Sequence, residues 1–306
     1  MRAWLVVVGM LGWQVSPALA QPAPSAIDAK DGDGWTALQR AAMGGKVAEI
    51  ERLVHAGASL EATDPHVYQG ATAVEIALDY SNGAAAEKLL ELGASIAPPH
   101  DANLLELASR EGEDRILVRL LAHGVSPAGT RALAYAAHYD HATAIARLLR
   151  AGARVDEIDH DDHDYTPLIV ACQNNAAGAA RALVAAGAKV NARDSDGMTV
   201  LHWAVYGARP DEIHVYRDLG KPHDTMYIAH AAAPIVELLV AHGAKVDAID
   251  GDGNTALHEA VFVNAAAAAR VLIHAGARRS IRNHDGQTAL DIARGRQNDV
   301  EPELAH

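Results

Sequence analysis

The sequence has little of several residue types. It contains one cysteine, Cys172, among 306 residues, so neither a disulfide framework nor a zinc site built from paired cysteines is available to it. Only 4% of its residues are aromatic although half are hydrophobic, because alanine dominates the apolar fraction. An ordinary globular core of this size uses larger side chains, so the composition favours thin layers of closely packed helices.

Positive charge is also scarce. Lys and Arg number 26 against 39 Asp and Glu, which gives a formal net charge of −13 at pH 7. A nucleic-acid-binding surface needs a basic face, so we expect no DNA or RNA partner. The acidic balance fits a protein partner of basic character.

Common catalytic motifs are absent as well, and the sequence contains only one long apolar run. No G-x-S-x-G elbow, phosphate-binding loop or H-E-x-x-H motif occurs, so we expect neither an enzyme nor a cofactor. The one apolar run, about residues 3–13, follows Arg2 and precedes Ala18-Leu-Ala20. This pattern indicates a bacterial secretory signal peptide. We therefore expect cleavage of residues 1–20, location in the periplasm and no membrane insertion afterwards.

The chain does contain an internal repeat. The clearest copy reads Asp250-Gly-Asp-Gly-Asn-Thr255-Ala-Leu-His258 and continues to a second apolar stretch that ends at Gly276-Ala277. Asp-Gly pairs form turns, Thr255 can cap a helix, and a glycine readily adopts the positive φ that ends one. We therefore expect each copy to be a turn followed by two short helices.

Two independent sequence markers recur with this repeat unit along the chain. The cap threonine, or the residue in its place, falls at Thr36, Thr72, Asn103, Arg131, Thr166, Thr199, Thr255 and Thr288. The glycine that ends the second helix falls at Gly57, Gly93, Gly124, Gly152, Gly187, Gly243 and Gly276. These markers predict seven or eight repeats over residues 30–297, with a linker at 21–29 and a C-terminal tail at 298–306. The longest interval, 56 residues, predicts an insertion at 208–230.

This unit resembles the ankyrin repeat, whose pattern is D-x-x-G-x-T-P-L-H-x-A followed by a second helix and G-A. The resemblance implies an all-α solenoid of helix-turn-helix units with β-hairpin loops. It also implies that His202 and His258, at the histidine of the pattern, bond the turn and are structural. Cys172 lies among small residues of a first helix, where we expect buried packing.

The family presents variable, partner-facing positions just before the cap threonine and near the end of the first helix. In this sequence those positions hold Trp35, Met43, Tyr80, His138, Tyr139, Tyr165, Asn174, Met198, Tyr206 and Phe262. Exposed Tyr and Trp are typical of binding hot spots, whereas the alternative is that these rings pack in the core. Trp203 and Tyr135 occupy positions that the family packs inside, so we expect them to be structural.

The resemblance and composition together predict a monomeric, non-enzymatic scaffold that binds a partner protein through the concave ankyrin groove. Acidic turn residues are expected to attract a basic partner: Asp31, Asp33, Asp161, Asp162, Asp164, Asp194, Asp196, Asp250 and Asp252. The alternative is a periplasmic metal-binding protein that uses His160 and His163 together with the insertion histidines. A selective metal site needs three or four ligands held in place, which an exposed turn does not guarantee, so we expect none.

Overall fold

The structure is a computed structural model that describes residues 26–63, 70–96, 101–158, 163–207, 233–296 and 300–305. The predicted signal peptide, the predicted insertion and His160 lie outside these ranges. Within them the chain forms sixteen α-helices and one short 3-10 helix, η1 (Ala26–Asp28). The all-α solenoid is confirmed. The hairpin loops of these segments contain no strands but two isolated antiparallel bridges, Arg193 with Thr199 and Ile249 with Thr255.

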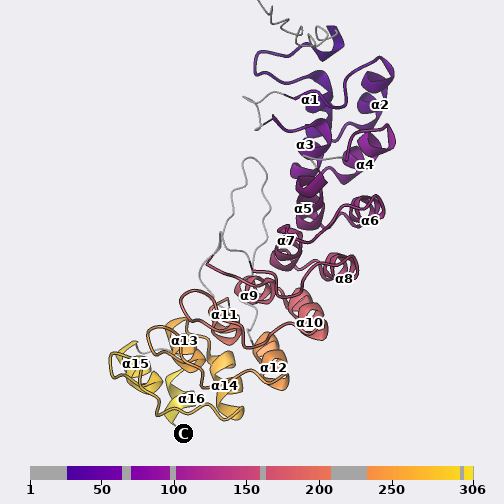
Figure 1. Ribbon diagram of the computed structural model, residues 1–306. Coiled ribbons are helices and arrows are strands. Elements are labelled where there is room, and N and C mark those ends of the chain that lie inside the picture. Colours follow the sequence, from indigo (N-terminus) through magenta and orange to yellow (C-terminus); the bar gives the residue numbers. More distant parts are fainter. Residues whose placement is uncertain are drawn as a thin grey trace, which may run out of the picture.

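The helices form two rows that follow the chain along a curved array (Figure 1). The first helices of the repeats are α1 (Ala37–Met43), α3 (Ala73–Asp79), α5 (Asp101–Glu111), α7 (Ala132–His138), α9 (Pro167–Gln173), α11 (Val200–Tyr206), α13 (Ala256–Phe262) and α15 (Ala289–Arg296). The second helices are α2 (Val47–His55), α4 (Gly83–Glu91), α6 (Asp114–Ala122), α8 (Ala142–Arg150), α10 (Ala177–Ala185), α12 (Ala233–Ala241), α14 (Ala266–His274) and α16 (Glu301–Ala305). Contacts join the two helices of each pair and run along each row.

Local sequence sets where these helices begin and end. At the start of α1, the Thr36 hydroxyl accepts the Gln39 N–H at 3.2 Å and the Gln39 side chain accepts the Thr36 N–H at 2.9 Å. The same reciprocal capping box starts α3 at Thr72 and α11 at Thr199, and such a cap stabilises a helix by about 1 kcal/mol. Each second helix from α2 to α14 is followed closely by a marker glycine in the left-handed region, such as Gly276 at φ 90°.

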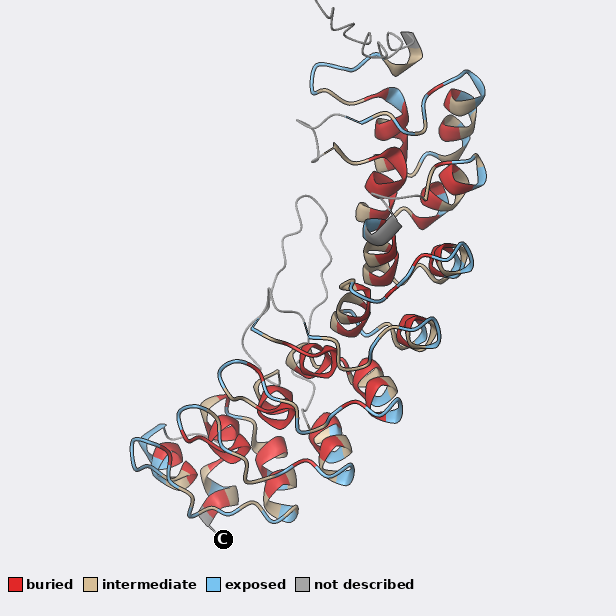
Figure 2. Cartoon of the chain, in the orientation of Figure 1, coloured by how far each residue is buried: buried red, intermediate tan, exposed pale blue. Residues whose placement is uncertain are grey.

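The core lies between the two rows and consists mainly of Ala, Leu, Ile and Val (Figure 2). Leu38, Ile50, Leu89 and Leu148 are among its fully buried large side chains. Each repeat supplies only a few of them, so a repeat is stable only when its neighbours cover its two faces. No helix in the described ranges combines the length and apolarity needed to cross a bilayer.

The third and fourth repeats depart from the predicted caps. Helix α5 already begins at Asp101, so Asn103 lies inside the helix and not at its cap as the sequence suggested. Arg131 does precede α7, but its side chain makes no capping bond. The neighbouring repeat supplies the missing contacts: Glu106 accepts the Arg131 N–H at 2.8 Å, and Glu75 accepts the Asn103 amide at 2.7 Å.

The C-terminal segment also differs from the expectation of a tail beginning at 298. Residues 301–305 form α16, which contacts α14 and α15. Val300 and Leu304 are 0% and 3% exposed, so they belong to the core. The array therefore has eight helix pairs within the described residues, and its packed part extends past residue 297 to Leu304.

Candidate functional site

Seven of the ten expected partner-facing residues lie at the carboxyl ends of first helices. Met43, His138, Tyr206 and Phe262 are the last residues of α1, α7, α11 and α13, and Tyr80, Tyr139 and Asn174 are the C-caps of α3, α7 and α9. Because every repeat follows the same path, these ends form a line along the first-helix row. Trp35, Tyr165 and Met198 instead precede the N-cap threonines Thr36, Thr166 and Thr199.

Tyr165 was expected on the partner-facing surface, but its side chain is only 7% exposed and belongs to the core. Its ring meets the Trp203 ring edge-on at 5.2 Å, and Trp203 meets Tyr206 in the same way at 5.2 Å. The Trp203 indole N–H donates to the Asp194 carboxylate at 2.8 Å, which satisfies its one polar atom. These three rings pack repeats five and six against each other. Trp203 is buried, as expected.

The other aromatic candidates are half-buried or exposed. Tyr139 is 38% exposed, and its ring lies 4.5 Å from that of His138 and 6.4 Å from that of His141. Trp35 and Phe262 are each covered by an arginine of this chain, Arg40 at 5.4 Å and Arg296 at 4.9 Å from the ring centre. Cation–π contacts of this kind hold a ring in one orientation without burying it.

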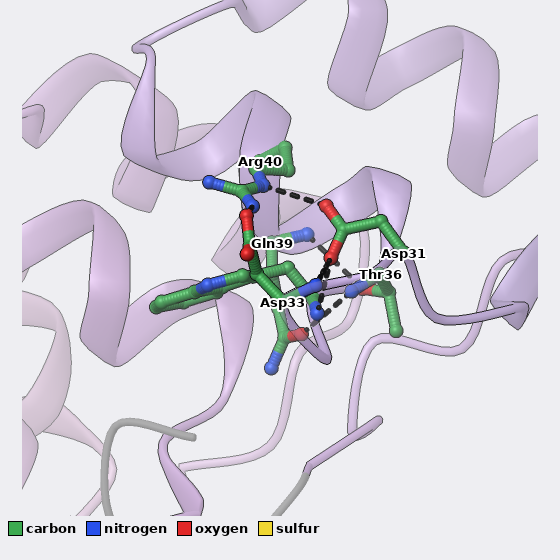
Figure 3. A network of polar contacts seen from close by, with 6 residues as sticks. Asp31, Asp33, Thr36, Gln39 and Arg40 are labelled. Atoms are coloured by element: carbon green, nitrogen blue, oxygen red, sulfur yellow. Dashed lines mark hydrogen bonds and ion pairs between the residues drawn. The ribbon is translucent and has the colours of Figure 1, made fainter.

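Arg40 is itself fixed by the first turn. It pairs with Asp31 at 2.8 Å and with Asp33 at 2.6 Å, directly beside the capping box of Thr36 and Gln39 (Figure 3). The hydrogen bond from Arg40 lowers the pKa of Asp31, which therefore stays ionised. The ring of Trp35, the turn and the start of α1 thus form one connected unit.

In repeats one, six and seven the leading acidic residue of the turn folds that turn. The Asp250 carboxylate accepts the N–H groups of Asp252 and Asn254 at 2.9 and 2.8 Å, and Asp31 and Asp194 act alike in their turns. In the eighth repeat Asn283 takes this role. Asp31, Asp194 and Asp250 therefore have a structural role in their turns, and their attraction of a partner stays a prediction.

The second acidic residue of each turn is exposed. Asp33, Asp196, Asp252 and Asp285 share this position in repeats one, six, seven and eight. Successive turns are joined by backbone hydrogen bonds, from Ser195 N–H to His163 O at 3.1 Å, from Gly251 N–H to Asp196 O at 3.0 Å and from His284 N–H to Asp252 O at 2.9 Å. The turns of repeats five to eight therefore form a continuous wall, which fixes the backbone positions of Asp196, Asp252 and Asp285 relative to one another.

Between this wall and the first helices lies a recess of about 620 Å³. The turns contribute Asp252, Asn254, Asn283, His284 and Asp285 to its lining. The helices contribute Tyr206, Glu259, Phe262 and Arg296. Two of the expected site residues, Tyr206 and Phe262, therefore meet in one hollow that also carries three carboxylates and one guanidinium.

Several lining residues were not anticipated from the sequence. Arg296 ends α15 as Phe262 ends α13, so applying the helix-end position to the eighth repeat would have found it. Asn283 also had a signal, because it stands where Asp250 stands one repeat earlier. Glu259 follows His258 inside α13 and has no distinguishing pattern.

The buried titratable groups are structural. His202 accepts the Thr199 N–H at 3.2 Å and its other ring nitrogen donates to Asn254 O of the next repeat at 3.0 Å. His258 makes the same pair of bonds to Thr255 and Gln287, and burial lowers the pKa of both histidines, which keeps them neutral. The Cys172 thiol is fully buried, which raises its pKa and suppresses the thiolate.

The metal alternative gains no support from the described ranges. No group of three or more His, Cys, Asp or Glu side chains there is arranged to hold an ion. His163 is exposed, and its ring stacks on Tyr165 at 5.7 Å. His160 and the insertion histidines lie outside these ranges.

Comparison with known proteins agrees with the repeat pattern. A family model described as ankyrin repeats (3 copies) matches residues 104–194, 157–213 and 225–301, and a model of a single ankyrin repeat matches residues 33–65. The B-cell lymphoma 3 protein homolog of Mus musculus is 27% identical over 165 residues, which cover 49% of this chain and 36% of that protein.

Two further relatives share shorter parts of their own length. SH3 and multiple ankyrin repeat domains protein 2 of Homo sapiens is 28% identical over 195 residues, covering 58% of this chain and 10% of that protein. A putative ankyrin repeat-containing protein of Treponema pallidum (strain Nichols) is 37% identical over 82 residues, covering 26% of this chain and 28% of that protein. The chain thus spans about a third or less of the length of these curated relatives.

Proposed function

The chain belongs to the ankyrin repeat family, and from that premise we propose that it is a non-enzymatic scaffold that binds a partner protein through its concave groove. The groove is the surface between the turn wall and the carboxyl ends of the first helices. Ankyrin repeats are in general protein-interaction modules. The observation that carries the proposal is the recess in which Tyr206 and Phe262 lie together against the turn wall.

Rigidity supports this function. Backbone hydrogen bonds join successive turns, and the packed rings of Tyr165, Trp203 and Tyr206 join repeats five and six. These contacts fix the groove in the free protein. A preorganised surface loses little conformational entropy on binding, so more of the contact energy appears as affinity. Half-exposed rings on such a surface are the side chains that most often dominate binding energy.

Charge supports a basic partner. Asp33, Asp196, Asp252 and Asp285, the second acidic residues of their turns, are exposed, and the whole chain has a net charge of −13. Such a field accelerates encounter with a basic protein and slows encounter with an acidic one. We propose that the scaffold itself is a monomer, which light scattering of the purified chain tests directly.

We also propose that the protein acts in the periplasm, from the signal-like pattern of residues 1–20. Sequencing of the amino terminus of the protein purified from its source cells tests this. A start at Gln21 supports export, and a retained Met1 argues against it.

The binding proposal is tested by capture of the natural partner from a periplasmic extract. We expect Tyr139→Ala combined with Tyr206→Ala to keep the helical content and to weaken capture. The control is Val118→Ala, which truncates an exposed side chain on the outer helix α6. Unchanged capture by the double variant would show that the partner binds elsewhere.

A further inference from the structure

The recess of repeats six to eight has an unequal charge balance. Asp252, Glu259 and Asp285 bring three carboxylates to its lining, while Arg296 brings one permanent positive charge. Arg296 is held against Phe262, with its guanidinium 4.9 Å from the ring centre and an N–H donated to Phe262 O at 3.2 Å. The lining therefore holds three carboxyl groups against one guanidinium.

The carboxylates differ in their exposure. Asp252 and Asp285 are exposed on adjacent turns at the rim, and the turn bond from His284 N–H to Asp252 O fixes their relative position. Glu259 of α13 also lines the recess and is only 8% exposed. Tyr206 and Phe262 supply aromatic surface on the helix side.

An elongated cation with an apolar stem matches this arrangement. Lysine and arginine side chains lay their methylene groups along apolar surface while the charged head stays among polar groups. Ionised carboxylates accept hydrogen bonds and donate none, so they favour an ammonium or guanidinium over an anion or a second acceptor. A volume of about 620 Å³ admits one such side chain with part of its backbone.

This inference rests on the groove function proposed above and adds the chemistry of one contact. We propose that the recess formed by repeats six to eight seats a lysine or arginine side chain from an extended segment of the partner protein. The aliphatic stem lies against Tyr206 and Phe262, and the cation lies between the rim carboxylates of Asp252 and Asp285. The recess then selects for a basic residue at one position of the partner segment.

The test uses three short labelled peptides that share a Gly-Ser backbone and differ only in two central residues, which are Lys, Gln or Glu. Their binding to the full chain is followed by fluorescence anisotropy at about 0.1 M salt, where the Debye length is about 10 Å. We expect the Lys peptide to bind best, and Asp252→Asn with Asp285→Asn to weaken its binding about two- to thirtyfold, because two exposed ion pairs of about 0.2–1 kcal/mol each are lost.

Glu91→Gln with Glu237→Gln is the matched control. It also removes two negative charges, but from exposed positions on the second helices α4 and α12, and neither residue lines the recess. We expect it to change Lys-peptide affinity less than twofold, roughly the limit for distant screened charges. Thermal unfolding followed by circular dichroism checks that both double variants fold.

Three results overturn the cation site: no detectable binding of the Lys peptide, equal binding of the Lys and Gln peptides, or equal weakening by both double variants. Partner capture separates this failure from failure of the groove. If the Tyr139→Ala and Tyr206→Ala variant no longer captures the partner while the three peptides bind equally, the groove proposal is supported and the cation-site proposal is wrong. If the Tyr139→Ala and Tyr206→Ala variant captures the partner normally, but Asp252→Asn with Asp285→Asn abolishes the preference for the Lys peptide, the recess binds cations and the partner uses another surface.

Discussion

The coupling between repeats six and seven depends on a neutral histidine at position 202, and replacing it with alanine tests that directly. His202 is 1% exposed and links two helix starts, because it caps α11 through Thr199 and donates to Asn254 O in the next turn. His202→Ala removes both bonds and leaves a cavity. Each hydrogen bond contributes about 0.5–1.5 kcal/mol, and the lost packing adds to this, so we expect a destabilisation of about 2–4 kcal/mol.

The chain contains its own control for this substitution. In repeat one Gln39 stands where His202 stands in repeat six. Its side-chain oxygen accepts the Thr36 N–H at 2.9 Å, and its amide donates to Ala62 O at 3.2 Å and Ala71 O at 3.1 Å. His202→Gln should therefore preserve both roles and cost less than about 1 kcal/mol.

The two substitutions also differ in their effect on pH dependence. Burial lowers the pKa of His202 below its usual 6.5, so below that pH the unfolded chain binds more protons than the folded one. The stability from neutral His202 is therefore complete above about pH 6.5 and is lost as the pH falls toward the lowered value in the folded state. His258 behaves in the same way. His202→Gln with His258→Gln should flatten this part of the profile.

Urea unfolding followed by circular dichroism at several pH values measures both effects. Because a repeat array can unfold in parts, hydrogen exchange of α11 and α13 should accompany it. The reasoning fails if His202→Ala is no less stable than His202→Gln, or if the double glutamine variant loses as much stability between about pH 7 and 5.5 as the natural chain.

Three further predictions concern packing. A Cβ at Gly207 would clash with Cys172 O, so Gly207→Ala should lower the free energy of unfolding by about 1–3 kcal/mol through overpacking. Gly295 of α15 has open space around it, so Gly295→Ala should cause no loss of stability. Thermal unfolding of both variants measures the difference. Leu304→Ala should lower the free energy of unfolding by about 2–5 kcal/mol because α16 is part of the core. An unchanged melting temperature would indicate that residues 298–306 form an unpacked tail, as the sequence suggested. Cys172 should react with a thiol-specific disulfide reagent only after unfolding, since its thiol is buried and its pKa raised; rapid labelling of the folded protein would contradict this.

The architecture could be predicted from the sequence because its signals are local. The cap threonine needs a partner only three residues away, as Thr36 and Gln39 show, and Gly57 or Gly276 marks a positive φ by its identity alone. In the third repeat, which lacks the cap threonine, the predicted helix start was wrong. Asn103 has no cap role because α5 starts earlier, and its contact is Glu75 of the preceding repeat, which no local pattern reveals.

The site was harder to predict because exposure depends on neighbours. Tyr165 and Tyr206 occupy family positions that face a partner, but Trp203 lies between them and draws Tyr165 into the core. The tail prediction failed for the same reason, since Val300 and Leu304 are ordinary apolar residues until α14 covers them. Burial of a ring or a terminal helix is set by tertiary packing and not by its own sequence.

The central claim is that the partner binds along the carboxyl ends of the first helices and not on the outer row. Photo-crosslinking tests it most directly, with a photoreactive phenylalanine analogue placed at Tyr139 in one variant and at Val118 in another, both exposed in the free protein. The account predicts a partner adduct from position 139 and none from position 118 in the same extract. An adduct from position 118 alone, or equal adducts from both, would contradict it.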